Sequence, residues 1–534
     1  MKRRQLLAAT AALPLAACDK SRVIQGGFIG ANEARGHLLR SGVSATLPTP
    51  SRTRNTRVLI AGGGVAGLSA ARALRLRGIN DFAVLELEDS AGGNSRGGQV
   101  NGLPCPLGAH YLPVPGDSAR EVQNLLEELG LRQRVSGRWQ YDEKHLCHSP
   151  QERLFINGQW QDGLLPAHDL DAAALADYRR FAQLVQQASN SANYTIPVSN
   201  KPLALMQRSL DAITFRAWLD QQNLASKQLR WYLDYCCRDD YGAGIEIVSA
   251  LAGIAYFASR HGFSAPGSEP VNDKEAGVLT WPQGNGWLTQ QLVQPLGERL
   301  LTGQVVLRIA TGKHGVEADV FDSTSRQIER WQVEHCIVCL PLFVAARVID
   351  PAPPALLAAA QQLRYASWLV ANIHIKTALH DRPGPAPSWD NVIYTPWPNA
   401  GDGLGYVDAM HQALIAVPGA TVLTHYRAFG IAPAARYKLL NASWASWRDT
   451  IVAELSVPHP DLADKATRID IMRYGHAMST PVPGIRSSVA LQALQTRAVG
   501  QRLHFAHGDL AGYSVFEEAF TQGYRRATAL AGGI

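Results

Sequence analysis

The sequence predicts an α/β protein, in which a mixed α+β domain is inserted into a Rossmann-like dinucleotide-binding domain. Two observations support this prediction. A short apolar run at residues 57–61 (RVLIA) is followed by glycines, by a helical pattern over 65–78 and by a second apolar run over 82–87 (FAVLEL), which together make one β-α-β unit. The chain of 534 residues is 46% hydrophobic and 18% charged, which leaves room for two or three domains with sizeable cores.

The glycines and the acid of this unit match the requirements of a dinucleotide-binding turn. Gly62 permits the tight turn out of the strand, Gly64 lets a pyrophosphate approach the backbone, and Gly67 lets helix and strand pack closely. The N-terminus of the helix offers free N–H groups and the positive end of its dipole to phosphates. Glu86 follows where an acid accepts hydrogen bonds from ribose hydroxyls. An acid there disfavours a 2′-phosphate, so NADP is not the expected ligand.

The first 18 residues have the features of an export signal. Basic residues precede an apolar stretch that is shorter than the ~20 residues needed to span a bilayer. Arg3 and Arg4 resemble a twin-arginine signal, and the run LAAC resembles a lipoprotein cleavage site at which Cys18 is acylated. Asp19 resembles the residue that retains lipoproteins in the inner membrane. We expect a protein anchored by lipid on the periplasmic side of that membrane; an ordinary signal peptide with a chance cysteine is the alternative.

The remaining elements are expected in a fixed order along the chain. Residues 19–55 are rich in Gly, Ser, Thr and Arg and predict a tether between the anchor and the first domain. The expected elements that follow are a helix over 118–131, a hairpin over 153–161 with an Asn157-Gly158 turn, helices over 168–260, a helix and strands over 285–345, a strand at 372–376, a helix over 434–455, and a strand, loop and long helix over 503–530.

Several functional classes are disfavoured by composition and motif. The net charge of +6 is spread along the chain without a basic block, so nucleic acid is not an expected partner. Cys336 and Cys339 have metal-ligand spacing, but they lie in an apolar run with no second ligand pair, so we expect a core strand and no metal. No G-x-S-x-G motif occurs, which argues against a hydrolase.

Four separated segments resemble the flavin-containing amine oxidase superfamily. They are RVLIAGGGVAGLSAARALRLRG, VLELEDSAGGNSRGG, WPQGNGWLTQQLVQPLGERL and LHFAHGDLAGYSVFEEAFTQGYRRA. Their order implies an FAD-binding domain made of residues 56–116, 280–345 and 485–534, and a substrate domain made of residues 117–279 and 346–484. No cysteine follows Cys339 to tether a flavin, so the resemblance implies noncovalent FAD.

The resemblance also implies roles for individual residues. FAD would be bound along its length by Gly62, Gly64, Ala66, Gly67, Glu86, Gly93, Asn94, Arg96, Gly108, Ala109, Val306, Gly508, Asp509, Phe516 and Ala519. The substrate pocket that the resemblance implies consists of His110, Tyr111, Tyr474, His476 and Tyr513. The dipole of the last helix would stabilise negative charge on reduced flavin.

The chain departs from the family pattern near the substrate. Asn94 stands where the family often has Arg, with Arg96 as a possible substitute. The family's lysine near flavin N5 is absent, and one position of its aromatic cage falls near Val515. Asp239, Asp240 and Glu246 could attract a cationic substrate, although exposed helix-end charges are the commoner explanation of such residues.

Three functions remain open from the sequence. The first is oxidation of an amine or polyamine by hydride transfer to flavin N5. The second is desaturation or dehydrogenation of a lipophilic substrate with electrons passed to a quinone, for which a membrane anchor would be suited. The third is flavin binding without catalysis. In the first two, O2 or a quinone reoxidises the cofactor, which carries the electron chemistry while the protein supplies orientation and electrostatics.

Overall fold

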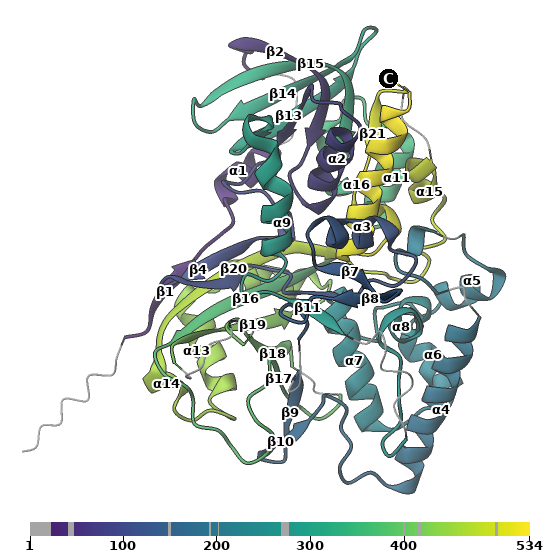
Figure 1. Ribbon diagram of the computed structural model, residues 1–534, viewed down its shortest axis with the longest axis vertical. Helices are drawn as coiled ribbons and strands as arrows, with labels where there is room; N and C mark the ends of the chain where they lie inside the picture. The colour runs from purple at the N-terminus through teal and green to yellow at the C-terminus, as the bar shows by residue number, and fades with distance from the viewer. Residues whose placement is uncertain are drawn as a thin grey trace, which may run out of the picture.

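The computed structural model describes residues 23–40, 47–147, 151–191, 194–200, 202–268, 277–398, 401–411, 413, 419–496 and 500–533. Cys18 and the export signal predicted for residues 1–18 lie outside these ranges. Two large sheets dominate the described part, one above the other in Figure 1, and a helical lobe lies beside the lower sheet. No helix among the described residues is both long and apolar enough to cross a membrane.

The upper sheet contains the predicted β-α-β unit. Its strand order is β12-β3-β2-β15-β14-β13, and β21 pairs with β15. The strands are β2 (Arg52–Ala61), β3 (Phe82–Leu85), β12 (Leu300–Leu301), β13 (Gln304–Thr311), β14 (Val316–Asp322), β15 (Gln327–Val338) and β21 (Leu503–Phe505). β2 is parallel to β3 and β15, as a Rossmann-like sheet requires. Cys336 and Cys339 are buried free thiols at the end of β15, which confirms the core-strand interpretation.

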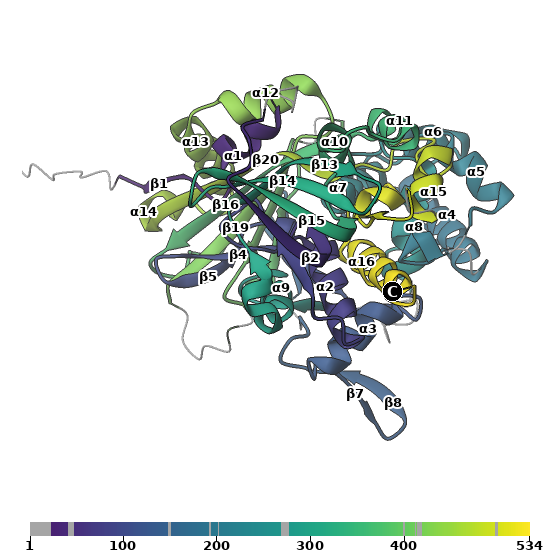
Figure 2. The same ribbon diagram turned by 90° about the horizontal axis from the view of Figure 1, so that it is seen from above.

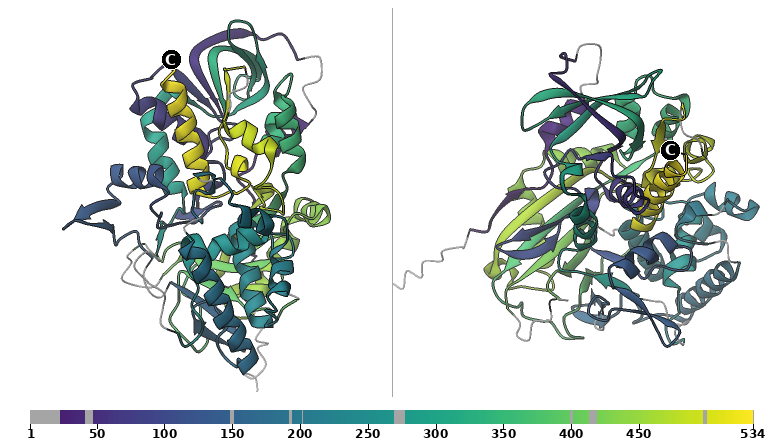
Figure 3. Two further views of the ribbon diagram at one scale, coloured as in Figure 1. Left: turned by 90° about the vertical axis from the view of Figure 1, so that its right-hand side faces the viewer. Right: turned by 45° about the horizontal axis from the view of Figure 1, so that its top comes forward.

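Helices cover both faces of the upper sheet because its strands are apolar on both sides. Val58 and Ile60 of β2 pack on one face, and Leu59 and Ala61 pack on the other. The first face carries α2 (Val65–Leu76), α3 (Arg120–Glu128), α9 (Gly286–Val293) and α16 (Phe516–Ala531); the second carries α10 (Leu342–Val348), α11 (Pro354–Gln362) and α15 (Val489–Thr496). α16 and α2 lie side by side in the right panel of Figure 3.

Two helices correct the predicted domain boundaries. α3 and α11 fall in segments that the sequence assigned to the substrate domain, yet both pack on the upper sheet. Leu125 and Leu126 of α3 join the core around α2 and α16, and Leu356 of α11 joins the core on the opposite face. The dinucleotide-binding domain therefore extends past residues 116 and 345.

The lower sheet has eight strands in the order β1-β20-β16-β19-β18-β17-β9-β10. They are β1 (Gln25–Phe28), β9 (Glu152–Ile156), β10 (Gln159–Asp162), β16 (Tyr365–Ile375), β17 (Asp390–Ile393), β18 (Gly403–Asp408), β19 (Thr421–Ala428) and β20 (Ala466–Ser479). Asn157 and Gly158 join β9 to β10 with φ values of 52° and 81°, which confirms the predicted Asn-Gly hairpin turn.

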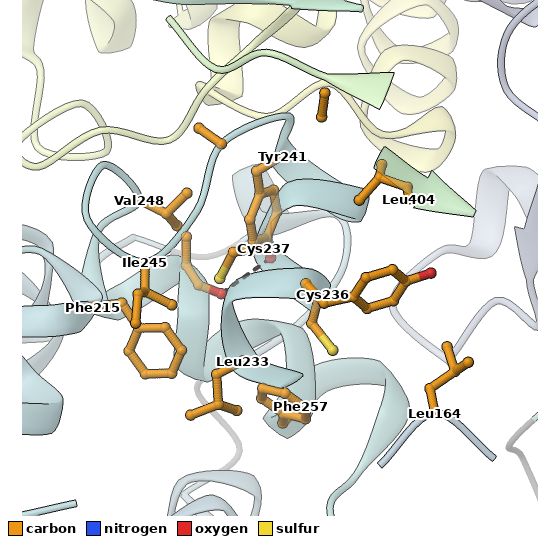
Figure 4. Packing of buried hydrophobic residues seen from close by; sticks show 14 of the residues in the cluster. Leu164, Phe215, Leu233, Cys236, Cys237, Tyr241, Ile245, Val248, Phe257 and Leu404 are labelled. Carbon is orange, nitrogen blue, oxygen red and sulfur yellow. Dashed lines mark hydrogen bonds between the residues drawn. The ribbon is translucent and has the colours of Figure 1, made fainter. Parts of the chain in front are cut away.

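The helical lobe follows the prediction for residues 168–260. It consists of α4 (Ala172–Asn190), α5 (Leu205–Asp211), α6 (Phe215–Gln221), α7 (Lys227–Tyr241) and α8 (Ala250–Tyr256), and α8 continues into a π-helical turn at Phe257–His261. Polar side chains cap the N-termini of α4, α6, α7 and α8. Cys236 and Cys237 pack as free thiols with Phe215, Tyr241 and Phe257 (Figure 4).

Smaller elements complete the molecule. Three two-stranded pairs are β4 (Gly97–Val100) with β5 (Leu103–Pro106), β6 (Tyr111–Pro113) with β11 (Val278–Thr280), and β7 (Arg132–Val135) with β8 (Arg138–Tyr141), the last of which projects from the body in Figure 2. The helix expected over 434–455 is two helices, α12 (Pro433–Asn441) and α13 (Trp444–Leu455), because Ala442 and Ser443 are extended and the Ser443 side chain caps α13. α14 (Leu462–Lys465) precedes β20.

The predicted tether is partly wrong. Within residues 19–55, two elements form: β1, which pairs in parallel with β20, and α1 (Glu33–Arg40). The side chain of Asn32 accepts a hydrogen bond from the Arg35 N–H at 3.0 Å, which stabilises the start of α1. The composition in Gly, Ser, Thr and Arg does not reveal these elements, because backbone pairing and polar contacts order the segment.

Candidate functional site

The loop between β2 and α2 has the geometry of a dinucleotide-binding turn. Gly62 has a φ of +106°, and a Cβ there would lie 2.8 Å from the Cys339 carbonyl oxygen. A Cβ at Gly67 would lie 1.9 Å from the Gly62 carbonyl oxygen, so α2 can approach β2 only with glycine at this position. Gly64 differs, because its φ of −73° suits any residue and a Cβ there would meet nothing closer than the Gly93 Cα at 3.9 Å. Packing within the protein therefore does not require glycine at position 64, which is consistent with the expected approach of a phosphate there.

The N-terminus of α2 is free to bind an anion. Its N-cap residue, Gly64, makes no side-chain cap, and its first turn contains no acidic residue. Ala66 in this turn packs against α16, where a Cβ at Gly523 would lie 2.0 Å from the Ala66 carbonyl oxygen. The uncapped N–H groups and the helix dipole suit phosphate oxygens.

Glu86 is held in place by backbone donors. Its Oε2 accepts a hydrogen bond from the Gly63 N–H and its Oε1 accepts one from the Glu88 N–H, both at 2.9 Å. Burial raises the pKa of Glu86 above its ordinary value. Each oxygen keeps acceptor capacity for a ribose hydroxyl. The Gln304 N–H donates to the Glu86 carbonyl oxygen at 2.8 Å, and Val306, another residue expected to bind FAD, lies two residues farther along β13.

Arg96 does not replace the missing family arginine in a simple way. Its guanidinium is buried and donates to the carbonyl oxygens of Gly93 at 3.2 Å and Gly30 at 2.7 Å. It also bonds to the Tyr474 hydroxyl. Asn94 is exposed and donates to the Ala477 carbonyl oxygen. Arg96 thus links two backbone segments by hydrogen bonds. Asn94 is the accessible side chain of the loop that begins at Gly92 and Gly93.

Asp509 is a buried carboxylate with one oxygen left for a ligand. Its Oδ2 accepts hydrogen bonds from the Leu342 N–H at 2.9 Å and the Tyr365 hydroxyl at 2.6 Å. Its Oδ1 has no hydrogen-bond partner among the described residues, although the His507 ring lies 3.3 Å away. Burial opposes ionisation, but His507 and these donors hold the pKa of Asp509 below its ordinary value. Gly508 precedes it in the same short turn.

The N-terminus of α16 differs from expectation. Phe516 stacks on Phe520 with ring centroids 5.8 Å apart, and Ala519 is half-buried one turn into the helix. Glu517 and Glu518 occupy the first turn and are buried. Glu517 pairs with Arg260, and Glu518 accepts a hydrogen bond from the Val198 N–H at 2.9 Å. Two carboxyl groups therefore share the helix end whose dipole is expected to stabilise negative charge on reduced flavin.

Residues 106–109 run between the two sheets with every carbonyl oxygen held. Pro106 accepts a hydrogen bond from the Asn372 side chain at 2.9 Å, and Leu107 accepts one from the Tyr474 hydroxyl at 2.7 Å. The Gly108 carbonyl oxygen accepts a hydrogen bond from the Tyr426 hydroxyl at 2.9 Å, and the Ala109 carbonyl oxygen accepts one from the Asn285 N–H at 3.0 Å. We call this segment the rail. It fixes where the next residues, His110 and Tyr111, enter the site.

Four side chains at the end of the rail form an aromatic group: His110, Tyr111, Trp389 and Tyr426. The His110 ring stacks on Tyr426 with a centroid distance of 4.4 Å and lies 5.4 Å from Trp389 and 4.9 Å from Tyr111. Burial lowers the pKa of His110 to about 3, so its imidazole is neutral at physiological pH. Tyr426 lies in β19 and Trp389 immediately precedes β17, and neither residue belongs to a sequence motif.

Beyond the aromatic group lies an acidic cluster: Glu152, Asp239, Asp240 and Asp390. The Tyr111 hydroxyl donates to Asp239 Oδ2 at 3.3 Å, which links the two groups. Asp390 follows Trp389 directly, pairs in register with Glu152 and accepts a hydrogen bond from Tyr235. Sequence reasoning placed Asp239 and Asp240 on an exposed helix end and missed the other two, because the cluster forms only when α7, β9 and β17 come together. Glu246 is exposed and pairs with Arg216.

The acidic cluster has too little positive charge around it. Among the described residues, Arg260 contacts Asp240 at 3.4 Å, and no Lys or Arg forms an ion pair with Glu152, Asp239 or Asp390. Burial raises the pKa of Asp239 to about 7, helped by the charge of Asp240, and raises that of Glu152 to about 7. Burial also raises the pKa of Asp390 well above its ordinary value. Such carboxyl groups either keep a proton or bind a cation.

The other predicted pocket residues lie apart from this cluster. Tyr474 binds the rail and Arg96. The His476 ring lies beside Phe343, with ring centroids 4.8 Å apart, and partial desolvation together with nearby arginines lowers the pKa of His476 to about 4. Tyr513 is buried and stacks on Tyr241 at 5.6 Å. The structure therefore joins His110 and Tyr111 of the predicted pocket and leaves His476 and Tyr513 outside the aromatic group.

Comparison with known proteins gives one family. A family model described as flavin containing amine oxidoreductase matches residues 65–426. A Mycobacterium tuberculosis protein named as a flavin-containing monoamine oxidase is 27% identical over 307 residues, covering 56% of this chain and 60% of that protein. An L-amino acid dehydrogenase of Synechocystis sp. is 26% identical over 305 residues, covering 55% and 58%. The chain thus aligns with less than two thirds of the length of these relatives.

Solved structures share the fold. A putrescine oxidase bound to putrescine superposes with a TM-score of 0.64 at 17% identity, covering 90% of this chain and 100% of that one. A cyclohexylamine oxidase from Brevibacterium oxydans gives 0.61 at 17% identity, covering 90% and 99%. These likenesses confirm the predicted α/β fold with its Rossmann-like domain and mixed second domain.

Gly64 and Gly67 should respond differently to alanine. We expect Gly64→Ala to leave the thermal unfolding of the apoprotein unchanged and to weaken FAD binding at least about tenfold, because the added methyl meets only the ligand. Gly67→Ala should lower the free energy of unfolding by about 1–3 kcal/mol even without FAD, because it pushes α2 from β2. Calorimetry of the apoproteins and FAD titration measure both. Equal FAD affinity in Gly64→Ala and wild type would contradict the assignment of this glycine.

Asp239→Asn should stabilise the substrate-free protein in a pH-dependent way. The pKa of Asp239 rises from an ordinary 3.8 to about 7 on folding, so between these values the folded state retains a proton that the unfolded state has lost. This group therefore reduces stability progressively as pH rises from about 4 to about 7. We expect the variant's Tm to exceed that of wild type by about 3 °C or more at pH 8 and to match it near pH 4. The exposed control Glu246→Gln should show no such trend; a pH-independent gain for Asp239→Asn would refute the buried-carboxyl assignment.

Proposed function

Because the chain belongs to the flavin containing amine oxidoreductase family, with FAD as its cofactor, we propose that it oxidises a diamine or polyamine. The observation that supports this proposal is the acidic cluster beyond the aromatic group. Three of its four carboxyl groups lack an ion-pair partner among the described residues, so a ligand with at least two positive charges suits the site best. The enzyme with bound putrescine that shares this fold has such a substrate.

The residues that would hold FAD fit it. The α2 N-terminus would face the pyrophosphate, Glu86 the adenosine ribose, the free Oδ1 of Asp509 a ribityl hydroxyl, and the rail the ring system. When bound, FAD supplies the two-electron oxidation of a C–H bond beside nitrogen. The open backbone at Gly64 and the unpaired buried oxygen of Asp509 are explained together by one extended dinucleotide.

The protein's own side chains would bind and orient the amine. Neutral His110, with Tyr426 and Trp389, presents aromatic faces that attract an ammonium group without repelling it. Asp390 and Glu152 would bind the distal ammonium, which is the one farther from the rail. Asp239, hydrogen-bonded to Tyr111, would accept hydrogen bonds from the amine nearer the rail.

The aromatic group around His110 could serve in place of the aromatic cage position that the family resemblance implies near Val515. Val515, where a cage aromatic is expected, is an extended residue before α16. The aromatic group is built instead around His110, with two of its members supplied by β19 and the residue preceding β17. An amine substrate therefore does not depend on the missing cage position.

The proposal makes separable predictions for Asp390→Asn. We expect its KM for putrescine and spermidine to rise about 10–100-fold, because a charged hydrogen bond to the distal ammonium is lost, while the KM for butylamine changes little. Wild-type KM for diamines should fall between pH 6 and pH 8 as Asp239 and Glu152 ionise. Steady-state kinetics and anaerobic bleaching of the flavin band near ~450 nm provide the measurements.

Glu246→Gln is the control, since it removes an exposed carboxylate just after α7, the helix that carries Asp239 and Asp240. Its diamine KM should equal that of wild type. Equal losses with monoamine and diamine in Asp390→Asn would contradict the distal-ammonium role. A flavin that no amine bleaches, but that a lipophilic donor reduces with a quinone as acceptor, would replace amine oxidation by the dehydrogenase alternative.

We further propose that the protein is exported and held by lipid on the periplasmic side of the inner membrane, with O2 or a quinone as electron acceptor. The supports are the twin-arginine and LAAC runs of the sequence. Only four residues separate Cys18 from the first described residue, Val23, so a lipid on Cys18 would hold the folded part close to the bilayer.

Cys18→Ala tests the anchor. We expect this variant to shift from the membrane pellet to the soluble fraction while keeping its flavin spectrum, because acylation needs the thiol but folding does not. Wild type should enter the pellet and incorporate radiolabelled palmitate. A wild-type protein that is soluble and unlabelled would contradict the lipid anchor, leaving the ordinary signal peptide.

A further inference from the structure

The segment of residues 23–40, which we call the strap, contacts the two loops that flank the FAD site. Arg35 donates to the Leu87 carbonyl oxygen at 3.0 Å and pairs with Asp89 at 2.7 Å. The Asn32 N–H is bound by both carboxylate oxygens of Glu88 at 3.1 Å. These contacts lie directly after Glu86, the residue placed at the adenosine ribose.

The strap also contacts the loop of residues 92–96 through the buried guanidinium of Arg96. Arg96 joins the Gly30 carbonyl oxygen of the strap to the Gly93 carbonyl oxygen. Gly93 faces Gly64 across the dinucleotide-binding turn, where a Cβ on Gly93 would lie 3.2 Å from the Gly64 Cα. The strap therefore touches the ribose loop (residues 86–89) and the phosphate loop (residues 92–96) at once.

The far side of the strap is fixed to the lower sheet. β1 pairs in parallel with β20 from Gln25↔Arg468 to Phe28↔Ile471, and Arg473 of β20 pairs with Glu33 and lies over the Phe28 ring at 3.7 Å. Gly30 has no room for a side chain, since a Cβ there would lie 1.8 Å from the Met472 sulfur. The strap is therefore held between the lower sheet and both cofactor loops.

We propose that the strap is part of the FAD site: it clamps the ribose and phosphate loops together, so that its docking slows FAD release and bound FAD stabilises its docking. The chain of contacts is continuous, because Asn32 is held by Glu88, whose own N–H holds the Glu86 carboxylate. Coupling between two binding events is reciprocal, so each must strengthen the other by the same factor. This inference depends on FAD as the cofactor and is independent of the substrate.

Limited trypsin digestion tests the coupling from the side of the strap. Arg40 ends the strap and is exposed, and Arg326 in the turn between β14 and β15 is an exposed reference site away from it. We expect saturating FAD to slow cleavage after Arg40 about tenfold in the full chain without slowing cleavage after Arg326. Cleavage that FAD leaves unchanged at Arg40, or slows equally at both sites, would overturn the proposal.

Arg35→Ala tests the coupling from the side of the cofactor. We expect the diluted holoprotein variant to release FAD about tenfold faster than wild type, followed by the rise of flavin fluorescence, because a charged donor to the ribose loop is lost. The control is Arg299→Ala, which removes a guanidinium that donates to the Asn80 carbonyl oxygen at 2.9 Å in the same domain but outside the strap. Release at the wild-type rate in Arg35→Ala, or equally fast release in the control, would overturn the proposal. Neither measurement uses a substrate, so failure of the amine proposal would not affect it.

Discussion

The hydrogen bonding of the rail is the constraint on which the site depends. Four successive carbonyl oxygens, from Pro106 to Ala109, are each bound by a donor from a different element: β16, β20, β19 and the loop before α9. Buried backbone carbonyl groups must have such partners, and here they fix the dinucleotide domain to the lower sheet. The rail begins beside the phosphate loop and ends at His110 and Tyr111, so it places the cofactor loops and the aromatic group on one continuous backbone.

The parts that sequence could predict are those whose physics is local. The β-α-β unit follows from apolar periodicity, glycine spacing and one acid, and the structure confirms the tight approach that Gly67 permits. The hairpin at Asn157-Gly158 likewise depends on the positive φ of two adjacent residues. In each case the residues that cause the structure lie within a few positions of its location.

The parts that sequence could not predict depend on long-range contacts. Asp390 and Glu152 belong to strands more than 200 residues apart in sequence, and only their register brings the two carboxyl groups together. The strap was expected to be a tether because it is polar, yet its order comes from backbone pairing with β20 and from Arg96, neither of which leaves a local pattern. Buried charge and added edge strands are therefore the features for which a three-dimensional structure was needed.

In the proposed function, the acidic cluster binds the cationic groups of the substrate beside the rail. Anaerobic, photoreduced protein cannot oxidise its ligand, so putrescine binding to it can be followed by calorimetry in buffers of different ionisation enthalpy. Because burial raises the pKa of Asp239 and Glu152 to about 7 and that of Asp390 well above its ordinary value, binding at pH 6.5 should release at least about one proton per putrescine, and the release should be smaller at pH 8.5. Putrescine that binds at pH 6.5 without proton release, or that does not bind at any pH, would contradict the account.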